Sequence, residues 1–103
     1  MPYIKQENRE NIDEEIKVLV RKLMDEGKYD KGTLNYIITT LMHYYIALNG
    51  LKYSNVNDVV GILECAKLEF YRKIAGPYED IKIDENGDLN VIEVPNKGVR
   101  DEN

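Results

Sequence analysis

Thirty consecutive residues in the middle of this 103-residue chain hold almost no charge, and this gap constrains the fold more than any other feature. Residues 31–60 carry three charged side chains, although Lys, Arg, Asp and Glu make up 32% of the sequence. The segment 1–30 has six basic and eight acidic residues, and the segment 61–103 has six and ten. A long uncharged segment has to be covered by the rest of the chain or by a second molecule.

The segment before this gap is predicted to be a helix from about Glu10 to Glu26, ended by Gly27. Its apolar residues recur at helical spacing on one face, and charged residues occupy the other side. The apolar residues are Ile12, Ile16, Leu19, Val20 and Leu23.

Inside the gap, the spacing predicts a second helix from about Leu34 to Leu48, with Thr33 as its N-cap. Two apolar stripes lie on nearly opposite sides of it. A helix that is apolar most of the way round is normally buried, so this one is expected to be the central helix or an oligomer interface.

A third helix is predicted up to about Ile74, capped by Ser54, Asn55 or Asn57 and stopped by Gly76-Pro77. From Ile81 the apolar period changes to two, and Asn86-Gly87 is the typical turn of a β-hairpin. The expected fold is therefore mainly α: a single three-helix domain over 1–94, with a short C-terminal β-hairpin at about 80–93 and a flexible tail over 95–103.

Composition excludes several classes of function. Fourteen basic residues against nineteen acidic ones give a net charge of -5, which argues against nucleic acid as a partner. No apolar run is long enough for a membrane span or a signal peptide, so a cytoplasmic protein is expected. With only one cysteine and one histidine, the chain has too few ligands for a closed zinc site or for an internal disulfide.

The first candidate site lies on the second helix. Tyr36, Thr40 and His43 share a face and are suited to hydrogen-bond and stack on a small polar ligand; Tyr44 is a further candidate contact. The alternative is a tyrosine-rich interface around a hydrogen-bonded histidine. No Ser, Cys or carboxylate shares that face, so catalysis is not predicted there.

The second candidate site lies on the third helix. Glu64 and Lys67 are three residues apart, and the carboxylate is a candidate general base or ligand anchor; the alternative is a paired charge at the edge of the core. Glu69, Arg72 and Lys73 lie elsewhere on the helix and are expected to form a solvated ion-pair cluster, with Arg72 kept as a candidate ligand contact.

Two further features are assigned a structural role. Cys65 has no cationic neighbour at helical spacing and is read as a structural thiol. Residues 82–93 approach the pattern of a calcium-binding EF-hand loop, but Lys82 stands where the first aspartate should coordinate the ion. A hairpin explains the same residues, so no metal or cofactor is predicted.

Several segments resemble a family of short proteins encoded by bacteriophages and bacterial genomes, over nearly all of residues 1–89. The resemblance rests on Met1–Ile4, Leu34–Thr39, Val60–Arg72, Pro77–Asp80 and Glu85–Asp88. It supplies no catalytic residues. It implies a phage-type binder in the host cytoplasm, which blocks a host protein or sequesters a nucleotide signal used in host defence.

The expected function is thus a small non-catalytic binding protein that forms a homo-oligomer through the 34–48 helix. Its partner would be a host protein or a small phosphorylated ligand. The alternative is a small hydrolase of phosphate esters or nucleotides, in which Glu64, with Glu69 or another carboxylate, holds a divalent metal.

Overall fold

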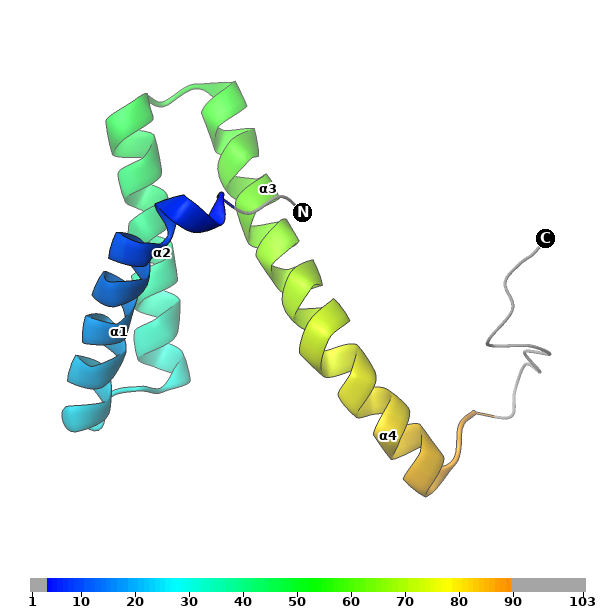
Figure 1. Cartoon of the computed structure of the whole chain (residues 1–103). Helices are drawn as coiled ribbons and strands as arrows, with labels where there is room; N and C mark the ends of the chain where they lie inside the picture. The colour runs from blue at the N-terminus through cyan, green and yellow to red at the C-terminus, as the bar shows by residue number, and fades with distance from the viewer. Residues whose placement is uncertain (1–3, 90–103) are drawn as a thin grey trace. The chain divides into compact units, whose positions relative to one another are not determined.

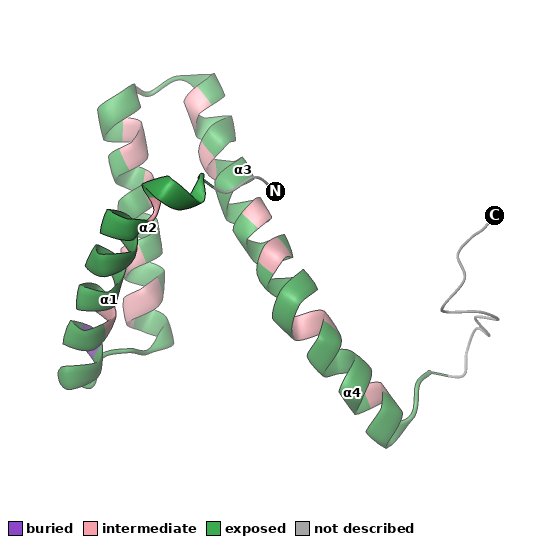
Figure 2. Cartoon of the chain, in the orientation of Figure 1, coloured by how far each residue is buried: buried purple, intermediate pink, exposed green. Residues whose placement is uncertain are grey.

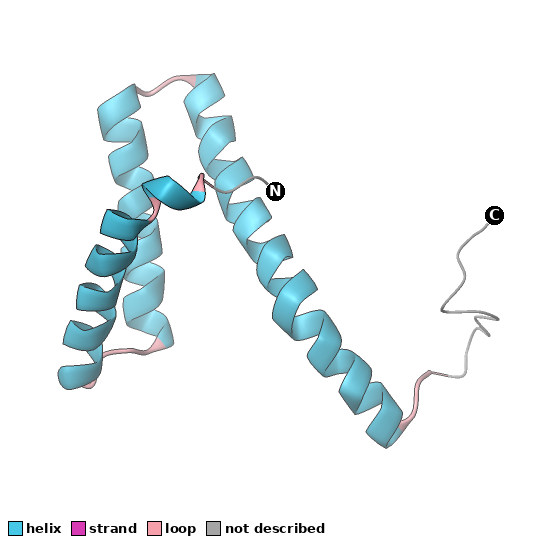
Figure 3. Cartoon of the chain, in the orientation of Figure 1, coloured by secondary structure: helices cyan, strands magenta, loops and turns pink. Residues whose placement is uncertain are grey.

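The computed structural model describes residues 4–89 and builds them from helices and loops, with no strand in this described part (Figure 1, Figure 3). The mainly helical class expected from the sequence is confirmed. The chain divides into two units, Met1–Ala66 and Lys67–Asn103. The elements are η1 (Gln6–Asn8), α1 (Glu10–Asp25), α2 (Lys31–Asn49), α3 (Tyr53–Phe70), the π-helical turn η2 (Tyr71–Ala75) and α4 (Gly76–Asn86).

Helix α1 confirms the first predicted helix, and its end shows why Gly27 stops it. Gly27 has a φ of +66°, which glycine adopts without strain. Its N–H donates to the carbonyl of Met24 (3.0 Å), and the N–H of Lys28 donates to that of Leu23 (2.8 Å). These two bonds form a Schellman motif, which satisfies carbonyls that the helix leaves open.

Helix α2 begins three residues before the predicted start, because Asp30 and not Thr33 is its N-cap. The Thr33 N–H donates to Oδ1 of Asp30 at 2.9 Å. Aspartate and threonine are both good N-caps, but the Asp30 carboxylate binds the third amide of the helix and thereby places Thr33 inside the first turn. At the other end, Gly50 (φ +105°) ends α2.

The cap makes the stability of α2 depend on pH in a defined direction. Hydrogen bonds from Thr33 lower the pKa of Asp30 below its usual 3.8. A lowered pKa stabilises the fold above the unfolded pKa, and this contribution is lost as the pH falls through the folded pKa. We therefore expect wild-type melting temperatures, followed by circular dichroism, to fall more steeply below about pH 4 than those of Asp30→Asn, which keeps a neutral cap. Equal slopes for the two proteins would contradict this assignment.

Side chains tie α2 to the start of α3 within the first unit. Nδ2 of Asn55 donates to the carbonyls of Asn49 (3.0 Å) and Gly50 (2.8 Å), where α2 has run out of backbone partners. The hydroxyl of Tyr45 donates to Oδ2 of Asp58 at 3.3 Å. Asn55 therefore joins the two helices, while α3 itself begins at Tyr53.

Gly76-Pro77 does not end the helical segment, contrary to the sequence prediction. The Gly76 N–H donates to the carbonyl of Tyr71, five residues back, so the turn before Pro77 is a π turn. Pro77 then lies in the first turn of α4, where its missing N–H costs little. The widened turn lets proline be accommodated without a break in the helix.

The predicted β-hairpin at about 80–93 is wrong over its described part. Residues up to Asn86 belong to α4, and Gly87 (φ +90°) ends this helix with its N–H donating to the carbonyl of Ile83 at 2.7 Å. An Asn-Gly pair suits a helix C-terminus as well as a hairpin turn, and only Ile81 and Ile83 supported the period of two before it. The rest of the predicted hairpin and the predicted tail over 95–103 lie outside the described residues.

Very little of the described chain is buried (Figure 2). Leu23, at 7% exposure, is the one buried residue among those that the structure describes. The other large apolar side chains of residues 4–89 are half-buried or exposed, including those of α2 and α3. Folding normally removes such side chains from water, so the helices present apolar surface that is available for contacts with another molecule.

Candidate functional site

The uncharged gap in the sequence becomes an exposed apolar surface on α2. Leu41, Tyr44 and Leu48 are 57%, 61% and 81% exposed. Their spacing of three and four residues places them on one side of the helix. No Lys, Arg, Asp or Glu lies between Gly32 and Asn49. We call Leu41, Tyr44 and Leu48 the α2 face.

The first unit also contains a pocket of about 420 Å³. Its walls are almost entirely apolar, and within residues 4–89 His43 is the one lining residue with a titratable side chain. The lining residues are Met42, His43, Ile46 and Ala47 of α2, Leu51, and Val59 of α3. A pocket of this composition suits an apolar or aromatic group better than a phosphate, which requires cations or clustered N–H groups.

The structure separates the four candidate residues of α2. His43 lines the pocket, whereas the lining among described residues does not include Tyr36, Thr40 or Tyr44. Tyr44 belongs to the α2 face instead. Tyr36 is 71% exposed and lies more than one helical turn before Leu41, the first residue of that face. The predicted group of Tyr36, Thr40 and His43 therefore does not form the wall of one cavity.

His43 is oriented by its own helix. Its Nδ1 lies 2.8 Å from the carbonyl oxygen of Thr39, and because a carbonyl only accepts, Nδ1 is the donor. In the neutral ring this leaves Nε2 as an acceptor. Among the described residues, the pocket lining brings no carboxylate, thiol or hydroxyl to the ring, so this part of the chain supports binding and offers no nucleophile there.

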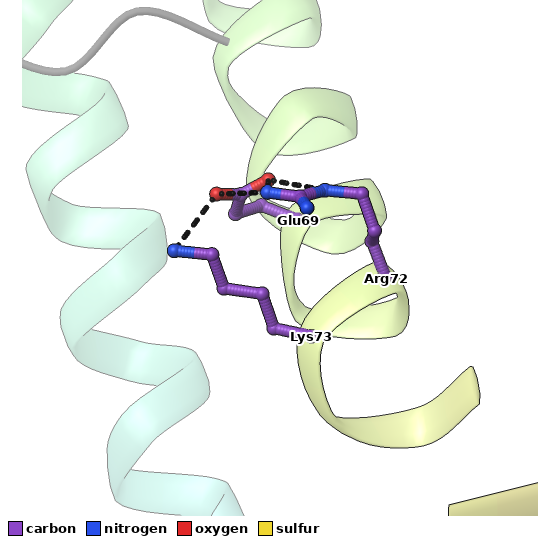
Figure 4. A network of polar contacts seen from close by, with 3 residues as sticks. All are labelled: Glu69, Arg72 and Lys73. Atoms are coloured by element: carbon purple, nitrogen blue, oxygen red, sulfur yellow. Dashed lines mark hydrogen bonds and ion pairs between the residues drawn. The ribbon is translucent and has the colours of Figure 1, made fainter. Parts of the chain in front are cut away.

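The predicted ion pairs of Glu69 with Arg72 and Lys73 form in the second unit, but the carboxylate is shielded and not solvated as expected (Figure 4). Nη2 of Arg72 lies 2.9 and 3.0 Å from the two carboxylate oxygens of Glu69, and Nζ of Lys73 lies 3.2 Å from Oε2. The Glu69 side chain is only 15% exposed, while both cations face solvent. Glu64 and Lys67, the other candidates on α3, are both exposed.

Sequence reasoning missed a hydrogen bond that spans the π turn. The hydroxyl of Tyr71 donates to Oε1 of Glu79 at 2.5 Å, although the two residues are eight positions apart. In a regular α-helix, eight residues turn about 80° past two full turns, so no helical pattern pairs these positions. The extra residue in the π turn brings them to the same side of the helix.

The hydrogen bond between Tyr71 and Glu79 changes the pKa of Tyr71. Hydrogen bonding to Glu79 raises the pKa of Tyr71 above its usual 10.0. Stability gained from a raised pKa is present below the unfolded pKa and is lost as the pH rises through the folded pKa. We expect Glu79→Gln to bring the pKa of Tyr71 back toward 10, measured as tyrosinate absorbance against pH, with Tyr71→Phe assigning the step.

Tyr45 provides the matched control for that titration. Burial raises its pKa, and the nearby charge of Asp58 adds to the effect. Asp58→Asn should therefore move the Tyr45 step and leave that of Tyr71 in place. If Glu79→Gln and wild type titrate identically, the Tyr71 bond does not form in solution.

Metal chemistry gains no support from the described residues. Among residues 4–89, no three His, Cys, Asp or Glu side chains gather where they could hold a metal ion. The start of the near match to a calcium loop, Lys82–Asn86, is part of helix α4. The same part of the chain contains no helix that combines the length and the apolar character needed to cross a membrane.

Comparison with known proteins agrees with the resemblance noted in the sequence at the level of a family without an assigned activity. A family model described as a domain of unknown function, DUF6899, matches residues 1–89. No curated protein and no solved structure matches the chain. Because the match spans most of its length, the chain belongs to the DUF6899 family.

Proposed function

We propose that this chain is a small non-catalytic binding protein that works as a homo-oligomer, with α2 as the contact between copies. The observation that carries the proposal is the α2 face. A helix face with three large, adjacent, exposed apolar side chains, in a stretch without charge from Gly32 to Asn49, is the kind of surface that is buried in oligomers.

The charge distribution favours a second copy as the molecule that covers this face. Each chain has a net charge of -5, so two copies repel each other over most of their surfaces. This repulsion is weakest where charged residues are absent, which is the part of α2 from Gly32 to Asn49. A symmetric contact of α2 with itself brings Leu41, Tyr44 and Leu48 of both copies together without placing a charge in the interface.

The chain's small core supports the same proposal. Small domains often lack the buried area for independent stability and gain it by oligomerising. Here Leu23 alone is buried among the described residues. Each large side chain of the α2 face that is covered adds on the order of 1 kcal/mol, because more than half of each of these residues is still exposed.

The biological partner that we propose is a protein of a bacterial host, in line with the resemblance to phage-type proteins. The pocket beside His43 supports a protein partner over a nucleotide-like ligand, since its lining in the described part of the chain includes no Lys or Arg to bind a phosphate. An apolar or aromatic side chain of the partner fits this lining.

The test is the mass of the protein in solution, measured by light scattering over a range of concentrations. A mass of at least twice the 12.0 kDa of one chain supports the proposal. A mass of 12.0 kDa at every concentration overturns it. Native mass spectrometry of the same sample decides the ligand class, because a retained nucleotide would contradict the preference for a protein partner.

A further inference from the structure

The second unit carries an apolar surface of its own. Phe70, Ile74, Tyr78 and Ile81 follow one another at spacings of four, four and three residues. They are 62%, 55%, 57% and 53% exposed. We call these four residues the C-terminal stripe; it is separate in sequence from the α2 face.

The π turn places the residues of the C-terminal stripe on one side of the helix. In a regular α-helix, Phe70 and Tyr78 would diverge by about 80°. The hydrogen bond between Tyr71 and Glu79, also eight residues apart across this turn, places such pairs on the same side of the helix. Phe70, Ile74 and Tyr78 therefore share one side, and Ile81 extends it by one turn.

Charge changes sign along this segment. From Lys67 to the midpoint of the stripe, the chain has four charged residues. Lys67, Arg72 and Lys73 are basic, and Glu69 is acidic. After the midpoint five are acidic and one, Lys82, is basic. The acidic residues are Glu79, Asp80, Asp84, Glu85 and Asp88.

We propose that the helical segment from Lys67 to Asn86 pairs in antiparallel orientation with the same segment of a second copy. This orientation places the basic end of each copy beside the acidic end of the other, whereas a parallel pair would place like charges together. A two-fold axis near Ala75 sets Phe70 opposite Ile81 and Ile74 opposite Tyr78. The charge asymmetry thus fixes both the occupant and its direction.

This contact goes beyond the proposed function, because it uses a surface other than the α2 face. A chain with two self-complementary surfaces forms either a closed tetramer or an open array. The C-terminal contact depends on charge and should weaken at high salt, where screening shortens the range of ion pairs. The α2 contact is apolar and should persist.

Site-specific cross-linking of the full chain tests the orientation. In a Cys65→Ser background, Ala75→Cys lies near the proposed two-fold axis, so a short bifunctional maleimide should join two copies. Lys67→Cys is the matched control on the same side of the helix, where antiparallel pairing separates the two thiols by about 25 Å. Cross-linking through both Lys67→Cys and Ala75→Cys would show a parallel pair, in which each residue lies beside its own copy, and cross-linking through neither would show no pair; both results overturn the proposal.

Charge-reversal variants test whether charge attraction causes the antiparallel pairing. Arg72→Glu/Lys73→Glu makes both ends acidic, and Asp80→Lys/Asp84→Lys/Glu85→Lys makes both ends basic. Each variant alone, carrying Ala75→Cys and Cys65→Ser, should cross-link about tenfold less, because several attractive pairs become repulsive. Mixing the two should restore the cross-link. Lys17→Glu/Arg21→Glu on α1 is the matched control and should have no effect; a yield unchanged by reversal at Arg72 and Lys73 overturns the role of charge.

The test of the C-terminal contact can be distinguished from the test of the α2 contact. Tyr44→Asp disrupts the α2 face and leaves the stripe intact, so the Ala75→Cys cross-link should persist in its presence. Loss of that cross-link in Tyr44→Asp would mean that α2 alone brings the copies together, which overturns the C-terminal contact and supports the α2 contact.

Discussion

Replacing Tyr44 with aspartate should disrupt the α2 contact and reduce the mass of the assembly. Tyr44 lies between Leu41 and Leu48 on the α2 face and is 61% exposed in the isolated chain. In a symmetric contact, the substitution places a carboxylate from each copy in an apolar interface, where an unpaired charge costs several kcal/mol. We expect association through α2 to weaken by more than about a hundredfold, seen as a loss of mass in light scattering at micromolar concentration.

Two variants make the Tyr44 result specific. Tyr44→Phe keeps the ring and should keep the assembly. Tyr29→Asp makes the same chemical change at a 49% exposed tyrosine in the loop before α2, and it should leave the mass unchanged. A Tyr44→Asp protein with wild-type mass would show that another face of α2, or another element, makes the contact.

Thermal stability should rise with protein concentration, because assembly completes the core. Dissociation precedes or accompanies unfolding in such a protein, so mass action raises the melting temperature as the chain becomes more concentrated. For a dimer, the described residues of two chains number about 170, and unfolding of these gives an expected shift of about 4 °C for each tenfold increase. Circular dichroism melts over a hundredfold range of concentration measure it.

The Tyr44→Asp protein is the control for this dependence as well. Without the α2 contact, it should melt at a lower temperature than wild type, and its melting temperature should change less with concentration. A wild-type melting temperature that stays constant over the hundredfold range would show that the single chain is stable by itself.

The helices were predictable where local signals act alone. The apolar stripe from Ile12 to Leu23 and the glycine at 27 placed α1 correctly, since a 3.6-residue period and a left-handed glycine are properties of the local chain. The start of α2 was misplaced because Asp30 and Thr33 are equally suitable caps, and only the structure shows which side chain reaches which amide.

The predicted β-hairpin is wrong because its turn signal is ambiguous as well. Asn86-Gly87 fits a hairpin turn and a helix end equally well, and two apolar residues are too few to define a period. The sequence predicts a helix stop at Pro77, because the π turn that accommodates this proline has no recognised signature in the sequence.

The candidate site was predictable only in part. The absence of charge identified α2 as the surface of interest, and the Glu69 cluster followed from helical spacing. The pocket beside His43 depends on Leu51 and Val59, which lie outside α2 and are brought near it by the turn that follows. Spacing within one helix cannot show such a contact, nor the bond between Tyr71 and Glu79 across a π turn.

The contact between copies can be detected residue by residue in solution. Isotope-labelled and unlabelled chains are mixed, and isotope-filtered nuclear Overhauser spectra record only proximities between different copies. We predict cross-peaks that join Leu41, Tyr44 and Leu48 of one copy to the same residues of another. Wild-type protein that yields no such cross-peaks, while the side chains of the α2 face remain accessible to a soluble paramagnetic probe, would contradict the central claim.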